Sequence, residues 1–521
     1  MRSRTEAVLI RRDGGGLLKV VPAGCKYRRS GEPARYPAAL AGGAAASHDS
    51  KVTRLVRSQG LLTTTHGLLL AAATFLGLSA AGTLELTFTL QPSYALLALA
   101  AVCGLPWALQ GWLSLPRTVQ LAAAALVAVY LIAMLAGSPA RLPSQGRGGA
   151  LRPLVYLVDL GLGLTIIALL CGVWSTSFGR RLLLAFCAGA TVTAALAVYQ
   201  WFALRFSLPL SDLNTAPNSD GFTTGHRFQG TGLLGWERTR GTFKEPLVLG
   251  IFCAMTLPLA VLAIRGARRR WRVSAAACLL FTGCAFALTV SSLSVGIFVA
   301  TGLVVALIVA LREGHVSAST GLAAFMALGL VVGPVMLSNP SSLSSLTGRT
   351  AEDLRLTADN RKDAWRNAVH RWEERPVLGY GPGQSSVRLA YRPDPQAVGR
   401  TQAPVVLGSA QGVWAASLVD AGILGLCAWA ALFAAVLWRG VRSTWRERGL
   451  GRALILWSAA TGAATAQFSG DRVDIRVWLA LGVLAATSNL GAGQPSRAHE
   501  QADEAAGRSP RNGVGADLAR G

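Results

Sequence analysis

Residues 273–311 read VSAAACLLFTGCAFALTVSSLSVGIFVATGLVVALIVAL, an apolar run of 39 residues. A helix needs about 20 apolar residues to cross the hydrocarbon core of a membrane. The run is therefore long enough for two crossings, and the expected turn between them is Ser291-Ser-Leu-Ser294. This stretch predicts an α-helical membrane protein.

The composition of the whole chain agrees with a protein that crosses the bilayer many times. Of its 521 residues, 52% are hydrophobic and 15% are charged, and the mean hydropathy is +0.42. A soluble enzyme fits these values poorly. The net charge of +24 would suggest nucleic acid in a soluble chain. Here the arginines cluster between apolar segments, which indicates anchoring and orientation in a membrane, so we expect membrane lipids and no nucleic acid as partners.

The cysteines and histidines indicate neither a disulfide framework nor a metal site. The eight cysteines form no CxxC pair, and all but Cys25 lie within or beside apolar stretches, as small packing residues do. The six histidines show no HExxH or similar ligand spacing. The sequence therefore predicts no metal and no cofactor.

Apolar windows of spanning length predict an all-α transmembrane bundle of about twelve spans. They lie near residues 61–81, 91–110, 118–136, 153–174, 182–204, 247–264, 273–290, 293–311, 319–337, 412–438, 453–468 and 474–490. Spans one to nine fall in residues 58–337 and spans ten to twelve in 412–490. The flanking segments 1–57 and 491–521 lack such windows and predict disordered cytoplasmic tails.

Arginine-rich short loops set the predicted orientation. They follow spans four, six, eight and ten, and all four fall on one side if the count of twelve holds. By the positive-inside rule that side is cytoplasmic, and so are both termini. The polar segment 205–246 and the large loop 338–411 then lie outside the cytoplasm. A loop this long between two spans is rarely an idle connector.

The first outer segment ends in Trp236-Glu-Arg-Thr-Arg-Gly-Thr-Phe-Lys-Glu-Pro246, directly before span six. Its arginines, Arg238 and Arg240, sit near the start of a helix, where guanidinium groups beside free backbone N–H groups can bind phosphate. Anchoring in lipid headgroups is an equal alternative.

The second outer segment, the loop 338–411, combines a short helix with a glycine-rich turn. Asp359 to Glu374 has helical spacing with Trp365 and Trp372 on one face, and Arg361, Arg366, Arg371 and Arg375 could reach phosphate. Pro376 ends this helix. Gly379-Tyr-Gly-Pro-Gly383 follows, a turn that lets backbone at Tyr380 and Gly381 approach a ligand closely, although such a run is more often only a turn.

Three stretches, taken in order, resemble the O-antigen ligase family of bacterial envelope glycosyltransferases over roughly residues 60–490. Arg238-Thr-Arg-Gly-Thr-Phe-Lys-Glu-Pro246 is similar to the family's Arg-x-x-Gly-x-Phe-x-x-Pro. Arg361-x-x-x-Trp365, continuing to Pro376-Val-Leu-Gly-Tyr-Gly-Pro-Gly383, resembles its Arg-x-x-x-Trp…Pro-Leu-Leu-Gly-x-Gly-x-Gly. Asp420-Ala-Gly-Ile-Leu-Gly425 resembles its Glu-x-Gly-Leu-Leu-Gly.

The resemblance implies a multi-pass enzyme of the bacterial inner membrane that works in cell-envelope polysaccharide biosynthesis. Such enzymes transfer a glycan from a polyprenyl-diphosphate carrier to a hydroxyl of a glycan or lipid acceptor, inverting the anomeric centre without a metal. The residues expected to bind substrate are Arg238, Arg240, Arg361, Trp365, Tyr380 and Gly381. Asp420 occupies the family's acidic position, and we expect it to hold the outer loop against the bundle.

The chain departs from the family where a base is expected. At the position of the usual His it has Gln411, which cannot take up a proton. The candidate catalytic residues are therefore Gln411, which would orient the acceptor hydroxyl, and Glu237; Glu245, His226 and His370 are further substitutes for the base. Three other functions stay open: a polymerase of lipid-linked glycan repeats, a non-catalytic binder of lipid-linked glycan, and a transporter.

Overall fold

The computed structural model describes residues 9–12, 18–21, 59–77, 84–85, 89–137, 148–209, 239–243, 246–266, 268–289, 291–314, 351–385, 412–447, 449–467 and 473–490. The chain divides into two units, Met1–Gln59 and Gly60–Gly521. In the first, strand β1 (Leu9–Arg12) pairs antiparallel with β2 (Leu18–Val21). This pair lies in the segment 1–57, where the sequence predicts a disordered tail. The predicted tail 491–521 lies outside the described residues.

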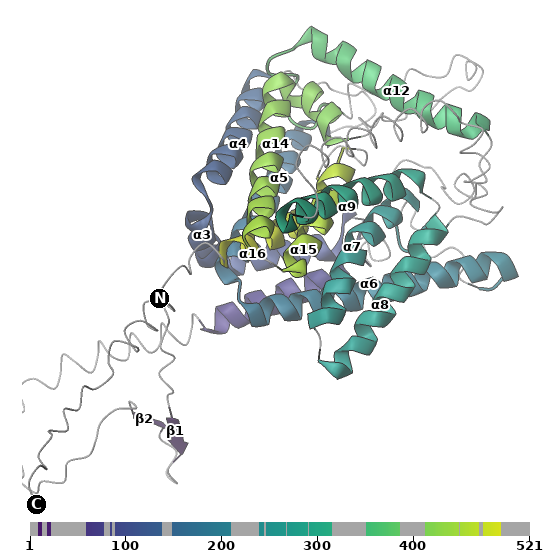
Figure 1. The fold of residues 1–521 in the computed structure, drawn as a ribbon. Helices are drawn as coiled ribbons and strands as arrows, with labels where there is room; N and C mark the ends of the chain where they lie inside the picture. The colour runs from purple at the N-terminus through teal and green to yellow at the C-terminus, as the bar shows by residue number, and fades with distance from the viewer. Residues whose placement is uncertain are drawn as a thin grey trace, which may run out of the picture. The chain divides into compact units, whose positions relative to one another are not determined.

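In its described residues, the second unit consists of α-helices apart from a pair of two-residue strands, β3 (Leu84–Glu85) and β4 (Thr89–Leu90). A first helix covers residues 59–75. The other helices, shown in Figure 1, are α2 (Pro92–Cys103), α3 (Leu105–Ser114), α4 (Arg117–Ala136), α5 (Gly148–Val173), α6 (Thr176–Phe206), α7 (Pro246–Gly266), α8 (Arg269–Thr289), α9 (Ser292–Glu313), α12 (Ala351–Glu374), α14 (Val413–Arg446), α15 (Leu450–Thr465) and α16 (Ile475–Leu490).

Seven of the described helices are long and apolar enough to cross a membrane, with mean hydropathies from 1.6 to 2.6. They are Arg117–Ala136, Pro153–Val173, Thr176–Phe206, Pro246–Gly266, Trp271–Thr289, Leu293–Glu313 and Val413–Arg446. A multi-pass helical membrane protein is thereby confirmed. The count of twelve stays a prediction, because the span expected near 319–337 lies outside the described residues and α15 and α16 have only 16 residues each.

The long apolar run at 273–311 divides as the sequence predicts. Helix α8 ends at Thr289 and α9 begins at Ser292. Ser291 caps α9, because its hydroxyl accepts a hydrogen bond from the Ser294 N–H group at 3.4 Å. The predicted break between the two helices is therefore confirmed at Ser291, but Ser292–Ser294, expected in the turn, already belong to α9.

The span predicted at residues 91–110 is instead a bent pair of helices. Helices α2 and α3 meet at Gly104 with a bend of 81°. Gly104 leaves the helical conformation, and Pro106 stands in the first turn of α3, where proline is tolerated. Beyond the bend, α3 lies directly on α5: a Cβ at Gly111 would come within 1.8 Å of the Ala168 carbonyl oxygen. Small residues of this kind let two helix backbones approach closely inside a membrane.

An aromatic cluster joins α4, α5, α14 and α16, and Figure 1 shows α4, α5 and α14 side by side. Trp429 of α14 donates its indole N–H to the hydroxyl of Tyr130 on α4 at 3.0 Å. Tyr130 stacks on Tyr156 of α5 with ring centroids 5.2 Å apart, and Trp429 packs on Trp478 of α16 at 5.7 Å. Each such ring pair contributes about 0.5–1.5 kcal/mol beyond its area burial. The cluster therefore fixes these four helices relative to one another.

The arginine-rich helix ends lie together. Arg312 at the end of α9 donates to the carbonyl oxygen of Glu447, directly after α14, at 3.1 Å. A Cβ at Gly451 in the first turn of α15 would lie 3.2 Å from Leu262 near the end of α7. The start of α6 and the end of α7 line one cavity. Such an arrangement is what a shared cytoplasmic side for these loops requires.

Candidate functional site

Helix α14 is broken at Gly422, which has φ 64° and ψ −158°. In an unbroken helix the Ile423 N–H group would donate to the Val419 carbonyl. Here it donates to the carbonyl oxygen of Pro376, directly after α12, at 2.9 Å. An unsatisfied backbone group in a membrane costs several kcal/mol, so the loop completes the hydrogen bonding of the span.

The glycine-rich turn after α12 supplies hydrogen-bond donors to the carbonyl groups of α14 just before the break. The N–H groups of Tyr380 and Gly381 donate to the carbonyl oxygens of Val419 and Asp420, at 2.9 and 2.8 Å. Gly379 has φ 61°, and a Cβ there would lie 2.4 Å from the Val419 oxygen. Glycine is therefore required for both the left-handed conformation and the close approach.

Asp420 anchors the end of this turn. Its side chain is fully buried. One carboxylate oxygen accepts from the Gly383 N–H at 3.0 Å and the other from the Ser385 N–H at 2.5 Å. Hydrogen bonds to a charged group contribute about 1.5–3 kcal/mol each. As expected, Asp420 therefore holds residues 383–385 against α14.

Helix α12 packs on the N-terminal part of α14 through a small apolar cluster. Figure 1 shows α12 beside the end of the bundle. Ala368 of α12 and the ring of Tyr380 pack with Ala415, Ala416 and Val419 of α14. Tyr380 is only 4% exposed, so its ring is used for packing. The helix ends at Glu374, before Pro376, as predicted, but begins earlier than expected, at Ala351.

Polar contacts lock the end of α12 to the turn. The Tyr380 hydroxyl donates to Glu374, which also accepts from Arg371 at 2.8 Å. These two hydrogen bonds hold the pKa of Glu374 below its usual value. The Arg375 guanidinium lies 5.2 Å from the centre of the Tyr380 ring. These contacts of Glu374, Arg371 and Arg375 attach the end of α12 to the glycine-rich turn.

Arg361 and Trp365 lie farther along α12, away from the fastened end. At a rise of 1.5 Å per residue, Arg361 is about 20 Å from Glu374 along the helix. Trp365 is 37% exposed. It precedes the buried Ala368 by three residues and follows Arg361 by four, so all three positions fall near one face of the helix. The structure thus separates Arg361 and Trp365 from Tyr380 and Gly381.

The other outer segment is held at the ends of α6 and α8. The backbone N–H groups of Arg240 and Gly241 both donate to the side-chain oxygen of Gln200, at 3.0 and 2.8 Å. Thr242 donates its hydroxyl to the Gly77 carbonyl at 2.6 Å. The Thr239 N–H group donates to the Leu288 carbonyl at 3.3 Å. Arg240 itself is 7% exposed, so it is enclosed by the bundle. Gln200 serves to hold this segment.

Asp474 and Arg476 form an ion pair at the start of α16 beside this segment. The Arg476 Nε atom lies 2.6 Å from Asp474 Oδ1, and its guanidinium lies 4.7 Å from the centre of the Phe243 ring. The Nη1 atom of Arg476 is buried and has no partner among the described residues. This pair was not predicted, because it lies at the edge of a predicted span. The signal that points to it is the charged run Asp471-Arg-Val-Asp-Ile-Arg476.

Three of the predicted site residues, Glu237, Arg238 and Gln411, lie outside the described residues, and for Arg361 only the backbone is described. Gly412, next to Gln411, is packed so tightly that a Cβ would lie 1.9 Å from the Gln467 carbonyl oxygen at the end of α15. Within the described ranges, no three His, Cys, Asp or Glu side chains are placed to hold a metal ion.

Comparison with known proteins gives one family. No curated protein matches the chain significantly. Residues 276–430 match the O-antigen ligase family. The matched region takes in most of α8, all of α9 and α12, the glycine-rich turn, Asp420 and the break at Gly422. It begins after the outer segment that contains Arg240. Over residues 276–430, the region that contains the docked turn described above, the chain is therefore similar to the O-antigen ligase family.

Proposed function

We propose that the protein transfers a glycan from a polyprenyl-diphosphate carrier to an acceptor hydroxyl on the outer face of the bacterial cytoplasmic membrane. One observation carries the proposal: the O-antigen ligase match covers α12, the glycine-rich turn and Asp420. These are the parts that fix the outer loop on a membrane bundle. The proposed function therefore rests on the family match and on the docked loop within the matched residues.

Docking of the loop supplies the rigidity that a transfer reaction needs. Two reactants held in reacting geometry gain a large rate advantage, and a displacement of about 1 Å can lower the rate about a hundredfold. Tyr380, Gly381 and Asp420 join the turn to α14 through backbone hydrogen bonds. In this proposal they act as positioning residues, with Tyr380 and Gly381 contributing through the placement of α12.

The diphosphate of the donor would be bound by arginines, because the planar guanidinium matches two phosphate oxygens at once. Arg366 and Arg371 already have carboxylate partners, Asp363 at 3.6 Å and Glu374 at 2.8 Å. We therefore assign the donor diphosphate to Arg361 on α12 and Arg238 on the segment before α7. Trp365, beside Arg361, offers a ring face for a sugar, and Arg240 holds the fold of its segment.

In the reaction, the acceptor oxygen forms a bond to the anomeric carbon of the donor sugar while the bond from that carbon to the diphosphate breaks. The proton of the acceptor hydroxyl passes to a base, and the diphosphate leaves on the carrier. Gln411 would orient the hydroxyl, since its amide both donates and accepts hydrogen bonds. Glu237 would take the proton. General base assistance contributes about 10²–10⁴ in rate.

The proposal is tested by deletion and complementation in the source bacterium. Loss of the protein should cause lipid-linked glycan to accumulate, and the wild-type gene should reverse this. Arg361→Lys and Arg238→Lys should fail to restore transfer, because lysine lacks the planar fork. Arg366→Lys is the matched control, on the same helix but paired with Asp363. Full transfer by both test variants, at wild-type protein levels in the membrane, would refute the assignment.

A polymerase that joins glycan repeats while they remain on the lipid is the second candidate. The family match favours it also, because it covers the shared outer loop and leaves the acceptor undefined. Chain length separates the two activities. A polymerase deletion leaves single repeats on the carrier, whereas a ligase deletion leaves long chains there.

A further inference from the structure

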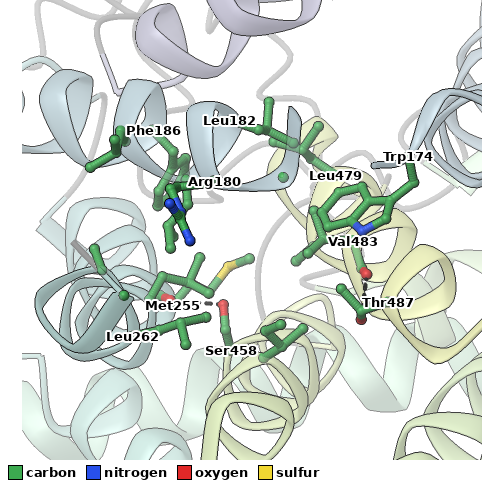
Figure 2. A pocket seen from close by; sticks show the side chains of 18 of the residues that line it. Trp174, Arg180, Leu182, Phe186, Met255, Leu262, Ser458, Leu479, Val483 and Thr487 are labelled. Atoms are coloured by element: carbon green, nitrogen blue, oxygen red, sulfur yellow. Dashed lines mark hydrogen bonds between the residues drawn. The ribbon is translucent and has the colours of Figure 1, made fainter. Parts of the chain in front are cut away.

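A cavity of about 280 Å³ lies between α6, α7, α15 and α16 (Figure 2). It is just below the range of about 300–1,000 Å³ that drug-sized ligands occupy. Its lining is largely apolar and includes Phe186, Phe252, Met255, Leu259 and Leu479. A slender hydrocarbon chain suits such a space better than a bulky polar molecule.

Two of the three hydroxyl side chains in the lining are already bonded to backbone. Ser458 donates to the Met255 carbonyl at 2.8 Å, and Thr487 donates to the Val483 carbonyl at 2.8 Å. Both bonds appear in Figure 2. A water or a polar ligand needs two to four polar partners to occupy a buried site. These walls therefore favour an apolar occupant.

The length of the cavity matches one leaflet of a membrane. Its lining on α16 extends from Arg476 to Thr487. Eleven residues at 1.5 Å each give about 16 Å, close to half of the hydrocarbon core of about 30 Å. The lining also includes Arg180 near the start of α6 and Gly266 at the end of α7, helix ends that adjoin the arginine-rich loops.

Arg180 gives that end a positive charge. Its side chain projects into the cavity above Met255 and Leu262 (Figure 2). In the part of the chain that the structure describes, it forms no ion pair or hydrogen bond. Arg265, beside Gly266, is exposed at the same end. An occupant with an apolar chain and an anionic head complements both the walls and the charge.

We propose that this cavity binds one acyl chain of an anionic phospholipid, with the headgroup phosphate at Arg180. The headgroup end of the site is at Arg180, whereas the other end of the cavity, at Arg476, lies beside Phe243 of the segment 239–243. The inference stands without the proposed function, because it uses only the cavity, its charge and the membrane setting.

Native mass spectrometry of the purified full-length protein, after exchange into equimolar phosphatidylglycerol and phosphatidylcholine, tests the proposal. Wild type should retain phosphatidylglycerol preferentially. Arg180→Gln should lower that preference about 3- to 5-fold, the size of an exposed ion pair. Arg181→Gln, which removes the neighbouring charge outside the lining, should leave the preference near that of wild type.

A second pair of variants tests the chain site. Gly266→Leu adds a side chain at the mouth, where a Cβ meets no atom within 4 Å, and should reduce retention of any phospholipid. Gly283→Leu on α8 is the matched control, because its Cβ is equally free and it lies outside the lining. Equal retention by these two variants, or equal preference in the two arginine variants, would overturn the proposal. Replacement of the phospholipid by added polyprenyl phosphate would also overturn it, by assigning the cavity to the carrier.

Discussion

Replacement of Asp420 by Asn removes the charge that holds the glycine-rich turn while keeping the shape of the side chain. The carboxylate accepts from two backbone N–H groups, those of Gly383 and Ser385. The Asn amide has one oxygen, so it keeps one bond and points an NH₂ group at the other donor. Loss of a hydrogen bond to a charged group costs about 1.5–3 kcal/mol. Because 1.4 kcal/mol corresponds to a tenfold change, the equilibrium constant for docking of the turn on α14 should fall about 10- to 150-fold.

Hydrogen exchange measures this loss at individual residues. The amides of Tyr380 and Gly381 are protected by the Val419 and Asp420 carbonyls only while the turn is docked. Their protection should fall by about 10- to 150-fold in Asp420→Asn, in line with the docking equilibrium. Asp363→Asn is the control, since Asp363 forms only an exposed ion pair on the same loop. Equal protection in the two variants would refute the anchoring role.

Four further results are expected. Gly422→Ala should detach the loop, because its φ is 64° and a Cβ would lie 2.4 Å from loop backbone; wild-type hydrogen exchange would contradict this. Glu374 has a lowered pKa, so its stabilisation of the docked turn should be constant above its ordinary pKa of 4.5 and be lost as the pH falls through the lower folded value. The difference in Tyr380 amide exchange between wild type and Glu374→Gln, measured at matched pH, should therefore shrink in acid. Glu237→Gln should lower glycan transfer about 10²–10⁴-fold, and Gln411→His in that background should restore part of it, because His supplies another base; unchanged transfer in Glu237→Gln would refute the role of Glu237. A cysteine replacing the exposed Asn367 should react with an impermeant thiol reagent added from outside the cytoplasm, and labelling only from inside would invert the predicted topology.

The sequence predicts the helices well where hydrophobicity alone determines them. The turn at Ser291 follows from a run too long for one crossing and from a cluster of serines within it. The bend at Gly104 could not be predicted, because one glycine in an apolar window is equally compatible with a straight span. Its effect depends on the contact of α3 with α5, which periodicity does not reveal.

For the candidate site, the role of Asp420 was predicted because this carboxylate occupies the acidic position of the family that the sequence resembles. The burial of Tyr380 could not be read from the sequence, since a Tyr between two glycines also suits an open ligand site. The distance of Arg361 from the turn depends on α12 being a continuous helix to Glu374. The ion pair of Asp474 and Arg476 was not predicted, because a charge at the predicted edge of a span resembles an interfacial anchor.

The break at Gly422 has a consequence for how the protein is made. An ordinary spanning helix satisfies its own backbone and can enter the lipid alone. The segment of α14 around Val419 and Asp420 instead leaves carbonyl groups that only the turn after α12 satisfies. The turn precedes α14 in the chain, so it is synthesised first. Insertion of α14 is therefore coupled to the translocation of the preceding loop, and a chain whose loop remained on the wrong side would carry a defective span.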